Sequence, residues 1–133
     1  IKREGYYDLE IVDTLLSKSS DTELFPITFM FIRVRMGDRY FSRDAIFRIM
    51  DFIKGSMGKN HVTAELSKGY FVVIMYKTDL AAAEKTREEM LSKWEAFSKG
   101  AELETVLREV VSTENPRNTF YHEKDRLLDL ANW

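Results

Sequence analysis

Five arginine side chains lie within sixteen residues of one another, at Arg33, Arg35, Arg39, Arg43 and Arg48. A guanidinium group is a permanent cation whose paired N–H donors fit the oxygens of phosphate and carboxylate groups. The candidate ligand-binding residues at the end of an apolar segment are Arg33, Arg35, Asp38 and Arg39. Their chemistry predicts a site for a phosphate-bearing ligand.

A second interpretation needs no ligand. Asp38, Asp44 and Asp51 are interspersed with the arginines, and exposed surfaces normally carry mixed charges of this kind. Arg33 is different, because it alternates with Ile32 and Val34 in an apolar segment. If those two side chains face one side of a buried strand, Arg33 faces the other and needs a partner or a ligand to compensate its charge.

Other reactive groups are sparse. The chain has no cysteine, which excludes disulfides and thiolate chemistry. His61 and His122 lack the spacing of metal ligands, and the sequence shows no pairing of a nucleophile with a base. We therefore predict no catalytic residues, no metal site and no cofactor. The net charge of -2 argues against a nucleic-acid partner, and no apolar run reaches the ~20 residues that span a bilayer.

The elements that carry these residues follow from hydrophobic periodicity. With 133 residues, 44% of them hydrophobic, we expect a single domain over 1–133, and we expect it to be part of a longer protein. The pattern predicts helices that start near Leu9, after a Ser42 cap, after a Thr78 or Asp79 cap, and at Tyr121. It predicts strands at Ile27–Val34, Val62–Leu66, Tyr70–Tyr76 and Leu103–Val111.

This order predicts an α+β fold with a ferredoxin-like β-α-β-β-α-β core, in which a mainly antiparallel sheet has its helices on one face. Ile27–Val34 is expected to be the first and central strand, and Leu103–Val111 an edge strand. Ser67 to Gly69 should form the turn of a hairpin. The alternation of side chains places Phe71, Val73 and Met75 on one face of the sheet, and Val72 and Ile74 on the other.

The hairpin sequence Ala64–Met75, followed by Thr78-Asp79-Leu80, resembles the signature hairpin of GGDEF domains, the diguanylate cyclases. Ser67–Phe71 would stand where Gly-Gly-Asp-Glu-Phe lies in that family. Phe29–Arg35 resembles the family's first strand, and the resemblance covers roughly residues 8 to 131. It implies a GGDEF-like fold and a role in bacterial cyclic di-GMP signalling.

The resemblance also shows which functional groups are replaced. Arg33 stands at the family's metal-binding Asp, and Gly69 and Tyr70 replace the Asp and Glu of the signature turn. A guanidinium, a hydrogen and a phenol cannot bind magnesium as carboxylates do. The segment from Arg35 to Asp44 is shorter than the family's guanine-binding loop, although Asp44 matches one of its acids. These departures imply a degenerate domain that is not an enzyme.

The family's inhibitory Arg-x-x-Asp site would fall on Gly58-Lys59-Asn60-His61, which lacks the arginine. Within the family, the chain most resembles the PelD-type receptors of exopolysaccharide export. We expect a regulatory module that contacts other proteins or domains of its own chain and controls exopolysaccharide production. It would be cytoplasmic, or the cytosolic part of an inner-membrane protein. The alternative is a receptor for cyclic di-GMP or another nucleotide, which Arg33, Arg35 and Arg39 would bind.

Overall fold

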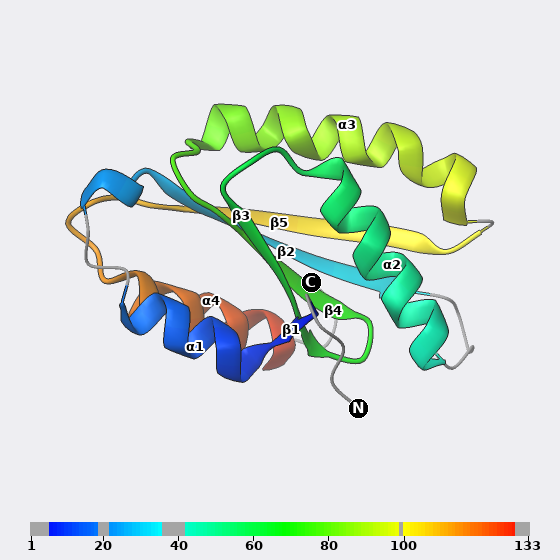
Figure 1. The fold of residues 1–133 in the computed structure, drawn as a ribbon, viewed down its shortest axis with the longest axis horizontal. Helices are drawn as coiled ribbons and strands as arrows, with labels where there is room; N and C mark the ends of the chain where they lie inside the picture. The colour runs from blue at the N-terminus through cyan, green and yellow to red at the C-terminus, as the bar shows by residue number, and fades with distance from the viewer. Residues whose placement is uncertain (1–5, 19–21, 36–41, 99, 130–133) are drawn as a thin grey trace.

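The fold is a five-stranded sheet with two helices on each face (Figure 1). A computed structural model describes residues 6–18, 22–35, 42–98 and 100–129. Its elements are β1 (Tyr7–Asp8), α1 (Leu9–Ser17), the short 3-10 helix η1 (Thr22–Leu24), β2 (Ile27–Arg35), α2 (Arg43–Ser56), β3 (His61–Ser67), β4 (Tyr70–Met75), α3 (Leu80–Ser98), β5 (Glu102–Val110) and α4 (Pro116–Asp129).

The strand order is β1-β3-β4-β2-β5, and every pairing is antiparallel except that of β1 with β3. The predicted hairpin is confirmed, with Gly69 at a φ of 78° in the turn between β3 and β4. Strand β5 lies at the edge, as predicted. The α+β class and its mainly antiparallel sheet are therefore as expected from the sequence.

The two helices of the β-α-β-β-α-β core, α2 and α3, lie on one face of the sheet, as predicted, and α1 and α4, which lie outside that core, cover the other face. Met30, Ile32 and Val34 of β2 pack with α2 and α3, whereas Phe29 and Phe31 pack with α1 and α4. In β4, Phe71, Val73 and Met75 share the first core and Val72 and Ile74 the second, as the alternation predicted. Because β2 and β4 are apolar on both faces, each face must be covered by helices.

The prediction that Ile27–Val34 is the first and central strand is wrong. The two-residue β1 precedes it, and β4 occupies the middle of the sheet. Strand β2 is nevertheless an interior strand between β4 and β5, and all its residues except Arg35 are buried. A β1 of two residues carries too little periodicity to be recognised in the sequence.

Local capping signals fix the starts of three helices. The side chains of Ser42, Asp79 and Asn115 accept hydrogen bonds from the backbone N–H groups of Ala45, Ala82 and Asn118. Helix α4 therefore begins at Pro116, five residues before the predicted start at Tyr121. Proline suits the first helical position because it has no N–H that needs a partner there.

Helix α3 buries side chains in its middle and exposes apolar side chains at its two ends. Ala83, Met90 and Trp94 are buried, but Leu80 and Phe97 are 40% and 41% exposed. Both lie in terminal turns of the helix, outside the part that packs on the sheet. Phe97 instead stacks on Phe52 of α2 with ring centroids 4.7 Å apart.

Helices α1 and α4 lie side by side on one face of the sheet and are joined by polar contacts as well as by the core (Figure 1). Asp13 of α1 accepts hydrogen bonds from the Tyr121 hydroxyl and the Arg117 Nε, each at 2.8 Å. These two bonds hold the pKa of Asp13 below its ordinary value. No helix within the described ranges is both long and apolar enough to cross a membrane.

Phe120 of α4 is fully buried and contacts Phe29 and Phe31, with ring centroids 5.7 and 5.8 Å apart respectively. Replacing Phe120 by Ala should lower the free energy of unfolding by roughly 3–5 kcal/mol, because it leaves a cavity between α4 and the sheet. The matched control is Phe97→Ala, which removes a ring that is 41% exposed and should cost about 1 kcal/mol or less. Urea unfolding measures both, and equal losses would contradict this account of the core.

Candidate functional site

Three side chains form a row across the sheet at the end nearest the hairpin turn. In the strand register, Arg33 of β2 lies opposite Tyr70 of β4 on one side and opposite Glu104 of β5 on the other. The backbone N–H of Val34 donates to the Gly69 carbonyl at 2.8 Å, which ties the end of β2 to the turn. The fold therefore brings the strand end and the turn together, although they are far apart in the sequence.

Arg33 is deeply buried, and Glu104 is its partner. The Arg33 side chain is 4% exposed, and its Nη2 donates to Glu104 Oε2 at 2.5 Å. The other carboxylate oxygen of Glu104 accepts from Arg35 Nη1 at 3.2 Å. The prediction that Arg33 faces away from Ile32 and Val34 and needs a partner is therefore confirmed.

Glu104 was not among the residues predicted from the sequence. It lies on β5, whose mixture of polar and apolar residues gives no direct sign of a buried ion pair. The available signal was the acidic pair Glu102 and Glu104 at the start of the edge strand, opposite the basic pair Arg35 and Arg33. That match becomes visible only when the register of β2 with β5 is known.

The local electrostatics keep both partners charged. Burial by itself would raise the pKa of Glu104, but hydrogen bonds from Arg33 and Arg35, together with their charges, hold it below the ordinary value. Burial would likewise lower the pKa of Arg33, and its bonds with Glu104 and Tyr70 raise it instead. The three groups Arg33, Arg35 and Glu104 thus carry a net positive charge at neutral pH.

The residues present do not fit the divalent metal that the GGDEF resemblance implies. Of the three positions where that family places carboxylates, Arg33 and Tyr70 face each other across the paired strands and Gly69 forms the turn. The nearby carboxylate, Glu104, is already bound by two guanidinium groups. In the part of the chain that the structure describes, no three His, Cys, Asp or Glu residues converge in a way that could bind a metal ion.

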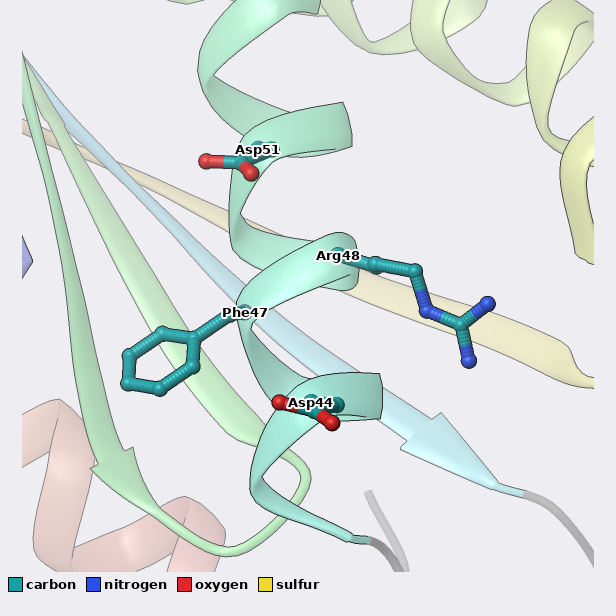
Figure 2. Close-up of a pocket in the computed structure, with 4 residues that line it drawn as sticks. All are labelled: Asp44, Phe47, Arg48 and Asp51. Carbon is teal, nitrogen blue, oxygen red and sulfur yellow. The ribbon is translucent and has the colours of Figure 1, made fainter.

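The five arginines do not form one site. Arg43, in the first turn of α2, makes two 3.0 Å hydrogen bonds to Glu65 of β3 and stacks over the Phe47 ring. Arg48 projects from the outer side of α2 (Figure 2). Of the predicted ligand-binding residues, the structure brings Arg33 and Arg35 together, whereas Asp38 and Arg39 lie outside the described residues.

A separate open hollow of about 540 Å³ lies on the outer face of α2 and is lined by Asp44, Phe47, Arg48 and Asp51. These positions repeat at helical spacing, so that they share one side of the helix. Figure 2 shows the Phe47 ring and the Arg48 guanidinium directed to opposite sides, with the two carboxylates between them. From the sequence, Asp51 was interpreted only as a counterion of the arginines, and Asp44 also as a match to one acid of the guanine-binding loop.

Glu104→Ala should lower the free energy of unfolding by about 3 kcal/mol, because it leaves the Arg33 guanidinium buried without its anion. Arg35→Ala is the matched control: it removes the other half of the same network, but its side chain is 54% exposed. Exposed ion pairs contribute little, so this variant should lose less than about 1 kcal/mol. Chemical denaturation measures both, and a Glu104→Ala variant as stable as Arg35→Ala would contradict the burial argument.

The same network predicts a dependence of stability on pH. Because the folded pKa of Glu104 lies below its ordinary value of 4.5, its contribution is complete above that value and is lost as the pH falls through the folded pKa. The stability difference between the natural chain and Glu104→Gln should therefore shrink from about pH 6 to about pH 3. Denaturation series at several pH values test this, and a constant difference would contradict it.

No family model matches the chain, and no curated protein matches it either. Solved structures do. The FimX GGDEF domain from Pseudomonas aeruginosa aligns with 96% of this chain and 91% of its own, at a TM-score of 0.73 and 12% identity. The GGDEF domain of PA1120 (YfiN or TpbB), from the same organism, aligns with 93% of this chain and 88% of its own, at a TM-score of 0.67 and 16% identity.

A third similar structure is the S helix-GGDEF-EAL part of LapD from Vibrio cholerae, described as bound to c-di-GMP. It covers 75% of this chain and 26% of its own, with a TM-score of 0.57 and 15% identity. At sequence identities of 12%, 16% and 15%, the similarity to these three structures shows the fold alone. The sheet and its four helices are those of a GGDEF-like fold.

Proposed function

We propose that this chain is a regulatory module that has the GGDEF fold but performs no cyclase chemistry, and that it acts in bacterial cyclic di-GMP signalling through contacts with other proteins or domains. The observation that carries the proposal is the buried Arg33. It stands where the sequence resemblance places a metal-binding Asp, and it is neutralised by Glu104 within the protein.

The chemistry of phosphoryl transfer supports this proposal. Divalent metal ions neutralise the charge of a triphosphate and help to activate the attacking hydroxyl, and they need carboxylate ligands. A guanidinium at position 33 repels a divalent cation instead of binding it. It is also tied to Glu104 and Tyr70, so that it cannot simply turn away from the sheet end.

In this proposal, the module controls exopolysaccharide production. The support is the resemblance of its altered turn, Ser67 to Gly69, and of the short segment after Arg35 to PelD-type receptors. A module of this kind transmits a signal through the shape and charge of the surface that contacts its partner, and it needs no turnover of a substrate. Deletion of the module's gene segment in the source cell should then change the amount of secreted polysaccharide.

A second candidate function is nucleotide binding at the same sheet end. Arg35 is 54% exposed, and it shares a single carboxylate with Arg33, so the three groups have one positive charge in excess. A phosphate group could take the exposed guanidinium as its partner. The similar LapD structure is described as bound to c-di-GMP, which makes this dinucleotide the first ligand to test.

The absence of cyclase activity is tested directly. Purified protein supplied with GTP and magnesium or manganese should form no cyclic di-GMP above the blank, because three metal-binding carboxylates are replaced. The Arg33→Asp, Tyr70→Glu double variant should also be inactive if the shortened segment between Arg35 and Asp44 has removed the guanine pocket. Turnover by the unmodified chain overturns the proposal, and turnover by the double variant alone means that the pocket survives.

Titration calorimetry with cyclic di-GMP, GTP and other cyclic dinucleotides separates the two candidate functions. A receptor should bind one of them with micromolar affinity, lose that binding in Arg35→Ala and keep it in Arg48→Ala. Arg48 is the matched control, since it is an exposed arginine of the same sequence cluster on a different surface. No heat of binding with any nucleotide favours the protein-interaction module.

A further inference from the structure

One edge of the sheet is long and regular. Strand β5 pairs with β2 without interruption, from Glu102 opposite Arg35 to Val110 opposite Ile27, and it contains no proline. Among the described residues, no strand pairs with its outer side (Figure 1). At the other edge of the sheet lies β1, which has two residues. Proteins usually shorten, bend or cover an edge strand, so an uninterrupted edge of nine residues is a template for a further strand.

The strand register decides which backbone groups of β5 point outward. The N–H of Val34 donates to the Gly69 carbonyl at 2.8 Å, on the β4 side of β2. Because the direction of backbone groups alternates along a strand, the even-numbered residues of β2 bond to β4 and the odd-numbered ones to β5. The partners of those odd-numbered residues are the even-numbered residues of β5. The outward N–H and C=O groups of β5 therefore belong to Leu103, Thr105, Leu107 and Glu109.

Helix α3 packs against β5 but does not bury it. Along β5, Glu102 is exposed, Val110 is buried and the residues between them are partly exposed. Strand β2, which has a neighbour on each side, buries all its residues except Arg35. The difference indicates that the outer side of β5 is accessible to another strand.

The charges of β5 restrict which strand can pair there. Glu102 at one end and Arg108 near the other share one face of the sheet, because their positions differ by an even number. Arg108 is 38% exposed, and its Nη2 donates to Glu114 Oε2 at 2.8 Å. On the other face, Leu103 and Leu107 pack against the core. When β5 is reversed, its acidic end lies opposite its basic end, so the strand is complementary to an antiparallel copy of itself.

One register satisfies both faces of the sheet. Odd-numbered residues must meet odd-numbered residues for their outward groups to bond, so the two-fold axis that relates two copies passes beside a single residue. With the axis at Thr105, Glu102 lies opposite Arg108 of the second copy, and the reciprocal pair forms at the other end. Leu103 then lies opposite Leu107 of the second copy. Charges meet opposite charges, and apolar side chains meet apolar ones.

The neighbouring registers are less favourable. An axis at Glu104 places this carboxylate directly opposite its own copy, and like charges at that spacing repel. An axis at Val106 places Leu103 opposite Glu109, and it demands a third cation partner of Glu104, which two guanidinium groups already bind. An axis at Leu107 brings no opposite charges together. The charges therefore select the register that is centred on Thr105.

We propose that the β5 edge is a docking surface for a second copy of this chain, and that two β5 strands pair antiparallel about Thr105 to form one continuous sheet. The pairing leaves β5 bonded to β2, so the ion pair of Arg33 with Glu104 stays intact. Each copy uses its β5 edge in the contact, so association stops at the dimer. The inference goes beyond the proposed function and holds whether or not the sheet end binds a nucleotide.

Sedimentation equilibrium of the full chain over a range of concentrations tests this pairing. The unmodified chain should form a reversible dimer and no larger species, and high salt should weaken the dimer. Glu102→Arg and Arg108→Glu should each weaken dimerisation at least about tenfold, because like charges then face each other at both ends of the contact. An equimolar mixture of the two variants should recover the dimer, because both contacts of the mixed pair again join opposite charges.

The matched control is Arg48→Glu, which makes the same change of charge at an exposed arginine on the outer face of α2. It should leave dimerisation unchanged. Three results would each overturn the proposal: a chain that stays monomeric at millimolar concentration, a dimer that neither reversal at positions 102 and 108 weakens, or a mixture that does not recover the dimer.

A measurement on the unmodified chain decides the question if a variant fails to fold. Hydrogen exchange followed by NMR at low and high protein concentration resolves single amides. The outward amides of Leu103, Thr105 and Leu107 should exchange more slowly as the dimer forms. Those of Glu104 and Val106 bond to β2 in both states and should change little. Outward amides whose exchange does not depend on concentration would contradict pairing through this edge.

Discussion

A guanidinium inside an apolar sheet is tolerated only if an anion accompanies it. Strand β2 buries eight of its nine residues, and Arg33 is among them. The position and state of several neighbours follow from that constraint. Glu104 must be ionised, and β5 must keep the register with β2 that places Glu104 opposite Arg33. Tyr70 must lie opposite Arg33 on the other neighbouring strand. The ion pair therefore fixes the arrangement of charges at this end of the sheet.

This constraint explains why the basic cluster of the sequence divides in space. Arg33 and Arg35 belong to one strand and share Glu104, whereas Arg43 lies on α2 and is bound by Glu65. Each of these carboxylates is on a different strand, and each fixes its arginine in a different place. A cluster of like charges in a sequence is therefore not evidence for one site until the counterions are located.

The elements of this fold could be predicted because their signals are local. The alternation in β4 identified both of its faces, and Ser42 and Asp79 marked the starts of α2 and α3. The errors had two sources. The place of Ile27–Val34 in the sheet depends on pairing with distant strands, whereas the Asn115 cap of α4 is a local signal that was interpreted as a turn.

In the candidate site, too, local features could be predicted from the sequence and long-range contacts could not. The need of Arg33 for a partner followed from the two-residue period of a strand, which is a local property. The identity of that partner followed from the pairing of residues 71 positions apart, which no local pattern encodes. Asp51 was likewise visible only as a charge, because its contact with Tyr6 spans 45 positions.

The location of Glu104 on an edge strand has one more consequence. Among the described residues, strand β5 pairs only with β2, and the edge strand of a sheet is the one most easily exchanged between molecules or lost to aggregation. Any state in which β5 separates from β2 leaves Arg33 as a bare cation among Phe31 and its apolar neighbours. The charge thus penalises the open state in which β2 has no β5 beside it, whichever molecule later supplies that strand. The same residue that needs an internal anion therefore also holds the edge strand to the rest of the sheet.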